Sequence, residues 1–576
     1  MKLSEFPYSR PDIKSLQDNF ATHIIDLRSS SDYAVFSTTL KRINNLRIDF
    51  ETQNALASIR YSVNTKDSFY SGERDFFDMN APHYEQMLND YYRVLAASKY
   101  KAEVSAEFGP HFLNKVNCML DTFHPEILQD LIKENELISK YNKLLASAEV
   151  EFEGKTQTLS QLAVFQYQSD RELRKKAADA GHSWFSENSS EFDSIFHDLV
   201  LVRHKIAIEL GYKNFTELAY KRLGRTDYGT KEIKDFRDAV SKYVVPLSNA
   251  LRVEQAKRIG VEKLEYYDFL FQFPKGNPFP KGNTEWVVEK TKNIFAELSP
   301  EANTFFKLMV EKELMDLESR SGKMSGGYCT SIPAYSVPFI FANSNGSNDD
   351  IRTLIHELGH AFFSHLSSKQ PLLEYAWPSL ETCEIHSMSL EFLAWPWTKL
   401  YFEEDNDYFQ YSHLLQAFFA LPMMAAGDEF QEWVYENPIA SPEERNKMWL
   451  KIEGKYSPFK SNSSSKYLET GRGWQRVTHF YNVPFYFIDY ALAQVCAFQF
   501  WAESRKDFKS AWKKYFDLCN LGGADSFTNI LKKSNVKNPF NEVVLKEVVE
   551  EIKCFFEENK KENGEKTGRI DDFISQ

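Results

Sequence analysis

The chain has 576 residues, 43% of them hydrophobic and 26% charged, a composition that excludes intrinsic disorder, collagen-like repeats and a disulfide scaffold. Its 82 acidic residues outnumber its 69 basic ones, and the net charge of −13 argues against nucleic acid and anionic membrane as main partners. Glycine is scarce, at 23 residues, which favours helices over a fold rich in tight turns.

The start of the chain and its cysteines predict a cytoplasmic protein. Residues 1–12 are polar and carry Pro7 and Pro11, so they lack the apolar core of a signal peptide. No run approaches the roughly 18 apolar residues that would cross a bilayer. The six cysteines are scattered without a CxxC pair, as expected for free thiols in a reducing compartment.

Helical periodicity dominates the first three hundred residues. Apolar residues recur at helical spacing in 83–108, 127–152 and 189–211, and Gly211 is a candidate stop for the last of these helices. No fixed-period repeat indicates a solenoid, and no long Pro/Gly/Ser-rich linker marks a domain boundary. We therefore expect a mainly α-helical fold.

Residues 320–350 break the helical pattern. The run PFIFAN (338–343) precedes an Asn-Gly turn, which predicts a strand closing into a hairpin. Such a strand is either an ordinary structural hairpin or an edge, including Phe341 and Ala342, that pairs with an extended peptide. Gly326, Gly327 and Tyr328 come before it and would permit close approach of a peptide backbone.

The segment 351–366 is predicted to be a helix that carries an HExxH motif. Four residues at about 100° each return the His360 imidazole to the face of His356, one turn along. Two such imidazoles can bind one Zn²⁺, and Glu357 is placed to take a proton from water bound to it. Chance alone would supply at most about 0.04 such motifs in this chain.

A catalytic zinc needs a third protein ligand, and the sequence offers several acids. Leu366 occupies the position of a third histidine in the extended HExxHxxGxxH pattern, which excludes that arrangement. The segment 378–395 predicts a helix beginning near Ser379, and three of its glutamates share one face, so that one can bind metal while the others hydrogen-bond the ligand histidines. Spacing does not choose among the nearby acids, which are Glu374, Glu381, Glu384 and Glu391.

The segment 474–494 concentrates a histidine and several tyrosines. Peptide hydrolysis passes through an oxyanion that needs donors beyond the metal, and an imidazole or a phenol can serve. By its sequence alone, such a segment is more often aromatic core than catalytic.

HELGHAF followed by EIHSMSLEFL resembles the M3 family of zinc metallopeptidases, in its oligoendopeptidase F branch. The resemblance extends along most of the chain, and the metal motifs are its most specific part. The further matching segments, in order, are YSRPD (8–12), SDRELRKKA (169–177), RHKIAIELGYKNF (203–215), RTDY (225–228), FQFPKGNP (271–278), GKMSGGYC (322–329), PFIFANSNG (338–346) and HFYNVPFYFIDYALAQ (479–494).

The resemblance implies a ligand set of His356, His360 and Glu384 for one Zn²⁺ per chain, because the family's third ligand is the glutamate that opens EIHSMS. Glu381 and Glu391 are then expected to support the ligand histidines.

The resemblance also assigns His479 and a tyrosine, Tyr486 or Tyr490, to the substrate carbonyl. The glycine-rich loop of the thimet-like branch is absent from this segment. The implied fold is a two-lobed helical body around a deep channel, with residues 1–190 as an N-terminal helical region in the channel wall and 191–576 as the catalytic region.

The resulting hypothesis is a zinc endopeptidase of short unstructured oligopeptides with Glu357 as general base. The alternatives are a catalytically silent peptide-binding protein of the same fold and a zinc carboxypeptidase or dipeptidase of similar architecture.

Overall fold

A computed structural model describes residues 1–320, 322–324, 326–462 and 464–562 of the chain. The predicted mainly helical fold with a small β element is confirmed, since helices form almost all of the regular structure in these ranges. None of the helices described is both long and apolar enough to span a bilayer.

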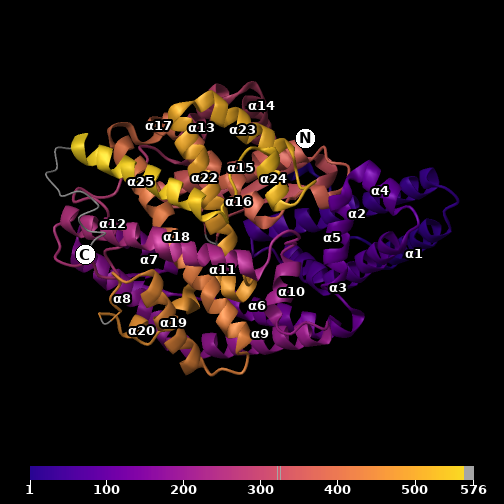
Figure 1. Ribbon diagram of the computed structural model, residues 1–576, viewed down its shortest axis with the longest axis horizontal. Coiled ribbons are helices and arrows are strands. Elements are labelled where there is room, and N and C mark those ends of the chain that lie inside the picture. The colour runs from indigo at the N-terminus through magenta and orange to yellow at the C-terminus, as the bar shows by residue number, and fades with distance from the viewer. Residues whose placement is uncertain (321, 325, 463, 563–576) are drawn as a thin grey trace.

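The amino-terminal helices form an arm that projects from the main body (Figure 1). The arm has its own apolar core, separate from the larger core of the body. The predicted helix over 83–108 is two helices, because Ser98 takes an extended backbone that ends the first one and its hydroxyl accepts the N–H of Tyr100 (3.1 Å). The arm comprises α1 (Ile13–Ser29), α2 (Tyr33–Val63), α3 (Ser68–Ala97), α4 (Lys101–Phe108) and α5 (Pro110–Leu120).

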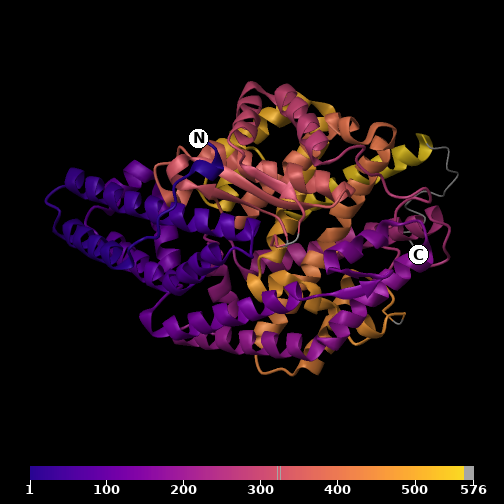
Figure 2. The ribbon, with the colours of Figure 1, turned by 180° about the vertical axis from the view of Figure 1, so that it is seen from behind.

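The middle of the chain contributes helices to both the lower and the upper part of the body, which Figure 2 shows from behind. The expected stop at Gly211 is confirmed, since α9 ends at Glu209 and Gly211 has a φ of +85° that favours glycine. The elements are α6 (Leu128–Ala146), β1 (Val150–Phe152), β2 (Lys155–Gln157), α7 (Leu159–Ala163), α8 (Arg171–Glu187), α9 (Ser189–Glu209), α10 (Phe215–Arg222), α11 (Thr230–Ala239), α12 (Val245–Arg258), α13 (Thr284–Leu298) and α14 (Pro300–Glu311).

A three-stranded sheet precedes the HExxH helix, as its position in the sequence predicts. The strands are β3 (Met315–Glu318), β4 (Tyr328–Ile332) and β5 (Val337–Ser344), in the order β3-β5-β4. β5 pairs in parallel with β3 and antiparallel with β4. The strand predicted over PFIFAN is therefore present, but it is the central strand.

The Asn-Gly turn after β5 opens a helix and does not close a hairpin. The Asp350 carboxylate accepts the backbone N–H of Asn345 (2.9 Å) and of Gly346 (2.6 Å), which turns the chain directly into α15 (Asn348–Ser367). The hairpin partner of β5 is β4, which comes before it in the chain.

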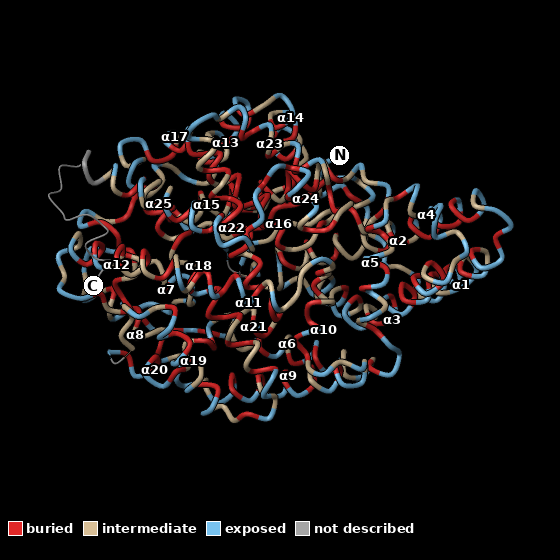
Figure 3. Tube along the Cα trace, viewed as in Figure 1, coloured by how far each residue is buried: buried red, intermediate tan, exposed pale blue. Residues whose placement is uncertain are grey.

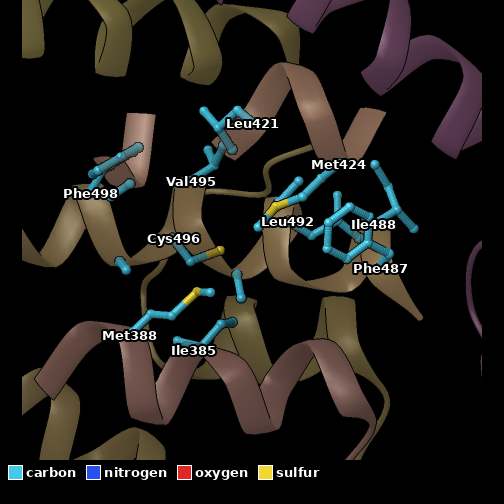
Figure 4. Close-up of a cluster of buried hydrophobic side chains, with 14 of the residues drawn as sticks. Ile385, Met388, Leu421, Met424, Phe487, Ile488, Leu492, Val495, Cys496 and Phe498 are labelled. Carbon is cyan, nitrogen blue, oxygen red and sulfur yellow. The ribbon is translucent and has the colours of Figure 1, made fainter. Parts of the chain in front are cut away.

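The carboxyl-terminal half packs its helices around α16 and α22, both buried along most of their length (Figure 3). Ile385 and Met388 of α16 meet Leu492 and Cys496 of α22 in the apolar cluster of Figure 4. The elements that follow α15 are α16 (Leu380–Leu393), α17 (Lys399–Phe402), α18 (Asn406–Glu436), α19 (Pro442–Tyr456), α20 (Lys466–Glu469), α21 (Thr478–Asn482), α22 (Phe487–Lys506), α23 (Phe508–Asn520), α24 (Phe527–Lys533) and α25 (Glu542–Glu562).

The segment 371–377, between α15 and α16, is held by the arm. The buried Glu374 carboxylate accepts hydrogen bonds from Arg47 Nη1 and Tyr92 Oη, both at 2.6 Å. Tyr375 Oη donates to the Phe108 carbonyl (2.7 Å), and Leu372 and Tyr375 pack in the arm's apolar core. The arm is thus anchored between the two helices on which the metal motifs lie.

Candidate metal centre

The helix α15 presents His356 and His360 on one face, one turn apart, with their ring centroids 4.9 Å from each other. α16 lies directly against this face. Gly359 makes the contact possible, because a Cβ there would come 2.6 Å from the Ser387 Cα. Any larger residue at position 359 would force the two helices apart.

α16 places Glu384 opposite the two imidazoles. Its Oε2 lies 3.3 Å from His356 Nε2 and 3.6 Å from His360 Nε2. One donor atom from each of these three residues falls within 4.8 Å of the others, and no other such group of metal-binding side chains occurs in the part of the chain that the structure describes. The three predicted ligands are therefore brought together.

This donor set fits a zinc ion. Two imidazoles and one carboxylate leave a fourth position for water or substrate, as in catalytic zinc sites. Burial alone would raise the pKa of Glu384, but the adjacent His360 and His356 hold it at about 2, so the carboxylate is ionised. Burial lowers the pKa of His360 to about 4, which leaves this ring neutral and able to bind a cation.

Glu357 lies beside the three donors and is not one of them. Its side chain is buried, and its Oε2 has no hydrogen-bond partner in the described chain. Burial raises the pKa of Glu357 to about 7, with Glu384 and Glu391 adding to the rise and His356 opposing it. A carboxyl group with this pKa is suited to accept and return a proton near neutral pH.

Glu381 and Glu391, the two glutamates of α16 that were expected to support the ligand histidines, have different surroundings. Glu391 Oε1 accepts the Nδ1–H of His356 at 2.7 Å, as expected of a group that orients a ligand histidine. Glu381 makes no hydrogen bond to either histidine in the described chain, so the structure gives no support to the expected role of this residue. Glu391 follows Glu384 by two full turns, whereas Glu381 is rotated by about 60° and lies near Arg225.

His479, Tyr486 and Tyr490 gather beside Glu384. The His479 ring centroid lies 5.7 Å from that of Tyr486 and 5.5 Å from that of Tyr490. The Tyr486 hydroxyl donates to Glu384 Oε1. The arrangement brings together the side chains that the resemblance assigns to the substrate carbonyl, and their catalytic role stays a prediction.

The edge strands of the sheet are β3 and β4, and β4 is the one that begins next to Glu357. Phe341 and Ala342 were expected at an edge, but β5 has a neighbour on both sides, and these two residues are 0% and 4% exposed. Gly327, immediately before β4, lies close to Glu357, because a Cβ there would come 3.7 Å from Glu357 Oε1. Gly326 precedes it with a φ of +94°, and Tyr328 begins the strand.

A cavity of about 750 Å³ runs along β4. All five residues of this strand line it, together with residues of α2, the last turns of α15 and the segment 368–377. None of the three metal-binding residues lines the cavity, so it extends away from the metal centre along the free edge of the sheet.

His413 and Trp395 belong to the site and were not foreseen. His413 Nε2 and Glu391 Oε2 lie 2.8 Å apart, and Trp395 Nε1 donates to His413 Nδ1 at 3.0 Å. Neither residue carries a motif, since His413 is one polar residue in the mostly apolar helix α18 and Trp395 follows α16 in an aromatic WPW run. The only feature of the sequence that points to a role for these two residues is that each places a polar group among apolar neighbours.

Two family models match the chain. The one described as "Peptidase M3 N-terminal domain" covers residues 3–123, and the one described as "Peptidase family M3" covers residues 164–550. The expected family is thereby confirmed. The division at residue 190 stays a prediction.

Known relatives agree with this match. The chain is 23% identical over 377 residues to Oligopeptidase PepF of Bacillus subtilis (strain 168), an alignment that covers 64% of this chain and 54% of that protein. The chain thus spans about half the length of that relative.

Solved structures are similar over nearly the whole chain. One titled "PZ peptidase A with inhibitor 2" has a TM-score of 0.95 and 46% identity, covering 97% of this chain and 99% of that one. A putative oligoendopeptidase F from Bacillus anthracis str. Ames has a TM-score of 0.89 and 43% identity, covering 96% and 98%.

Proposed function

The chain belongs to peptidase family M3, and from this premise we propose that it is a zinc-dependent endopeptidase that hydrolyses short, unstructured oligopeptides. The observation that carries the proposal is the convergence of His356, His360 and Glu384 beside the buried carboxyl of Glu357. This arrangement supplies both a metal site and a proton carrier within one enclosed space.

His356, His360 and Glu384 would hold one Zn²⁺. The ion supplies Lewis-acid polarisation of the scissile carbonyl and makes water a stronger acid. Two side chains favour binding of the ion. The ionised Glu384 balances the charge of a cation, and Glu391 fixes the orientation of the His356 ring.

Glu357 acts as the general base and then as the general acid. Its carboxylate takes a proton from the attacking water and delivers it to the nitrogen of the leaving amine, so that no net proton is consumed at the residue. The pKa near 7 that burial gives this group matches both steps.

His479 and the hydroxyl of Tyr486 or Tyr490 donate hydrogen bonds to the oxygen that becomes negative when the carbonyl is attacked. Such donors stabilise the transition state most where water is excluded, and His479, Tyr486 and Tyr490 are all partly buried. The contact of Tyr486 with Glu384 favours Tyr486 as the nearer of the two phenols to the metal centre.

An extended peptide would add to the free edge of β4. Backbone hydrogen bonds to an edge strand bind a chain without regard to its side chains, which suits a peptidase of broad specificity. The cavity of about 750 Å³ along β4 has room for a few residues in extended form and excludes a folded domain. The six cysteines are all free, which supports action in the reducing cytoplasm.

A pool of synthetic, unstructured nonapeptides, digested and then mapped by mass spectrometry, tests this function. We expect cleavage at internal bonds, its loss on treatment with a chelator and its return on addition of one equivalent of Zn²⁺. Stepwise release of terminal residues would instead establish the carboxypeptidase or dipeptidase alternative. Stoichiometric zinc without any cleavage would establish a silent peptide-binding protein.

A further inference from the structure

A line of hydrogen bonds runs from the ligand His356 through Glu391 to two residues of the site that are not among the three metal-binding residues. From this line we infer that His413 and Trp395 are positioning residues, which set the proton position and the ring orientation of the ligand His356 through Glu391. The inference rests on the proposed zinc function and assigns to it two residues on elements other than the HExxH helix.

The line starts at an indole, whose N–H can donate a hydrogen bond but never accept one. Trp395 Nε1 lies 3.0 Å from His413 Nδ1, so Nδ1 must be the acceptor and carry no proton. The proton of the neutral His413 ring is therefore on Nε2. A tryptophan thus decides the tautomer of a histidine on α18.

The next two links carry this choice to the metal centre. His413 Nε2–H donates to Glu391 Oε2 at 2.8 Å, and the other oxygen, Oε1, accepts from His356 Nδ1 at 2.7 Å. With both oxygens accepting, Glu391 requires the proton of His356 to be on Nδ1. The lone pair of His356 Nε2 is then directed at the position next to Glu384, where a metal is expected.

Packing holds the line in place. His413 is 2% exposed at its side chain, and its ring stacks on Phe392 with the centroids 4.7 Å apart and the planes at 4°. Trp395 is also buried. Because the two rings cannot turn without displacing these neighbours, Glu391 has one orientation in which both of its hydrogen bonds are made.

The second ligand histidine has no such support. His360 Nδ1 is buried without a hydrogen-bond partner in the described chain. Orientation of the metal-binding rings therefore depends more on the line behind His356 than on any group behind His360. Weakening that line should lower the affinity for metal.

The test measures the dissociation constant for Zn²⁺ of the purified full-length chain by competition with a chelator, together with the thermal midpoint in excess chelator. The variant His413→Leu, which removes the donor to Glu391, should bind Zn²⁺ about 10–100-fold more weakly. His413→Gln retains an N–H near the place of Nε2 and should bind within a few-fold of the wild type. Trp395→Phe should weaken binding by less than His413→Leu does.

Trp474→Phe is the matched control. Trp474 is also buried, and its Nε1 donates to a side chain, Asn446 Oδ1, at 2.8 Å. Both tryptophan variants should lower the thermal midpoint, but only Trp395→Phe should change the dissociation constant. Equal affinities of His413→Leu and the wild type, failure of His413→Gln to restore binding, or an equal effect of Trp474→Phe would overturn the inference. A wild-type chain that binds no Zn²⁺ would overturn the proposed function as well.

Discussion

At the scale of single residues, the contrast between Glu384 and Glu357 shows how position sets the chemistry of a carboxyl group. Both are buried in the same centre, but neighbouring imidazoles hold the pKa of Glu384 at about 2, whereas burial raises that of Glu357 to about 7. One is thus a permanent anion suited to a metal, and the other is a proton carrier.

Glu357→Gln tests this division of roles. The amide has the size of the carboxyl but cannot take a proton, so kcat should fall by about 10²–10⁴. Because Glu357 is not among the three converging donors, the dissociation constant for Zn²⁺ should stay within a few-fold of the wild type. Peptide turnover and metal competition, measured on the same preparation, check both parts. Hydrolysis at an undiminished rate would exclude Glu357 as the base.

Some site residues could be predicted from the sequence and others could not, for geometric reasons. His356 and His360 lie on one helix, so the helical repeat alone determines that they share a face. The choice of Glu384 as third ligand depends on how α16 packs across α15. The spacing of residues in the sequence does not determine this packing, so only the family resemblance predicted Glu384. His413 is brought to Glu391 by the packing of α18, which leaves no local pattern.

At the scale of elements, the site depends on the close approach of α15 and α16. A Cβ at Gly359 would meet the backbone of Ser387 and His386 at 2.6 and 2.8 Å, and backbone cannot move aside as a flexible side chain can. The distance between the ligand-bearing helices is therefore set by a residue inside the HExxH motif that binds nothing itself.

Gly359→Ala should destabilise the protein by about 1–3 kcal/mol, as overpacking of a core does. It should also weaken Zn²⁺ binding, because α15 must move away from Glu384. Gly454→Ala, in α19, is the control: nothing lies within 4 Å of the added Cβ, and alanine is the better helix former. Urea unfolding and metal competition of both variants check the prediction. Equal stability of the two would show that the helices adapt without cost.

The sheet shows where prediction from sequence fails at this scale. The apolar run in β5 correctly predicts a buried strand, and a strand buried on both sides is more typical of the centre of a sheet than of its edge. What the run cannot reveal is β3, which pairs in parallel from more than twenty residues upstream. The Asn-Gly signal likewise marks a real turn, but Asp350 makes that turn the entrance of a helix.

At the scale of the whole molecule, stability depends on histidines that are buried without a charge. Burial lowers the pKa of His111 to about 4, and the charge of Lys115 adds to this decrease. Burial lowers the pKa of His182 to about 3, and the charge of Arg476 adds to this decrease. The unfolded chain binds these protons near pH 6.5 and the folded chain does not. Their contribution to stability is thus fully present above pH 6.5 and is lost as the pH falls below it.

Between pH 6.5 and 5, each of these histidines should cost about 2 kcal/mol of unfolding free energy. The urea midpoint of the protein in excess chelator should therefore fall over this range, and His182→Gln should make the fall shallower. His124→Gln, at an exposed position, is the control for the replacement of a histidine by glutamine. Parallel slopes for wild type and His182→Gln would show that this histidine does not contribute.

The contacts between the segment 371–377 and the arm determine whether a shortened version of the protein would be stable. Two family models divide the chain, and the second, over 164–550, contains all the proposed catalytic residues. Isolation of that part without the arm would remove Arg47 and Tyr92, the hydrogen-bond donors to the Glu374 carboxylate. It would also expose Leu372 and Tyr375, whose apolar neighbours belong to the arm. The parts of the chain that the two family models match are therefore expected to unfold as one cooperative unit. A shortened version of this peptidase must retain the arm or replace its polar and apolar contacts with the segment 371–377.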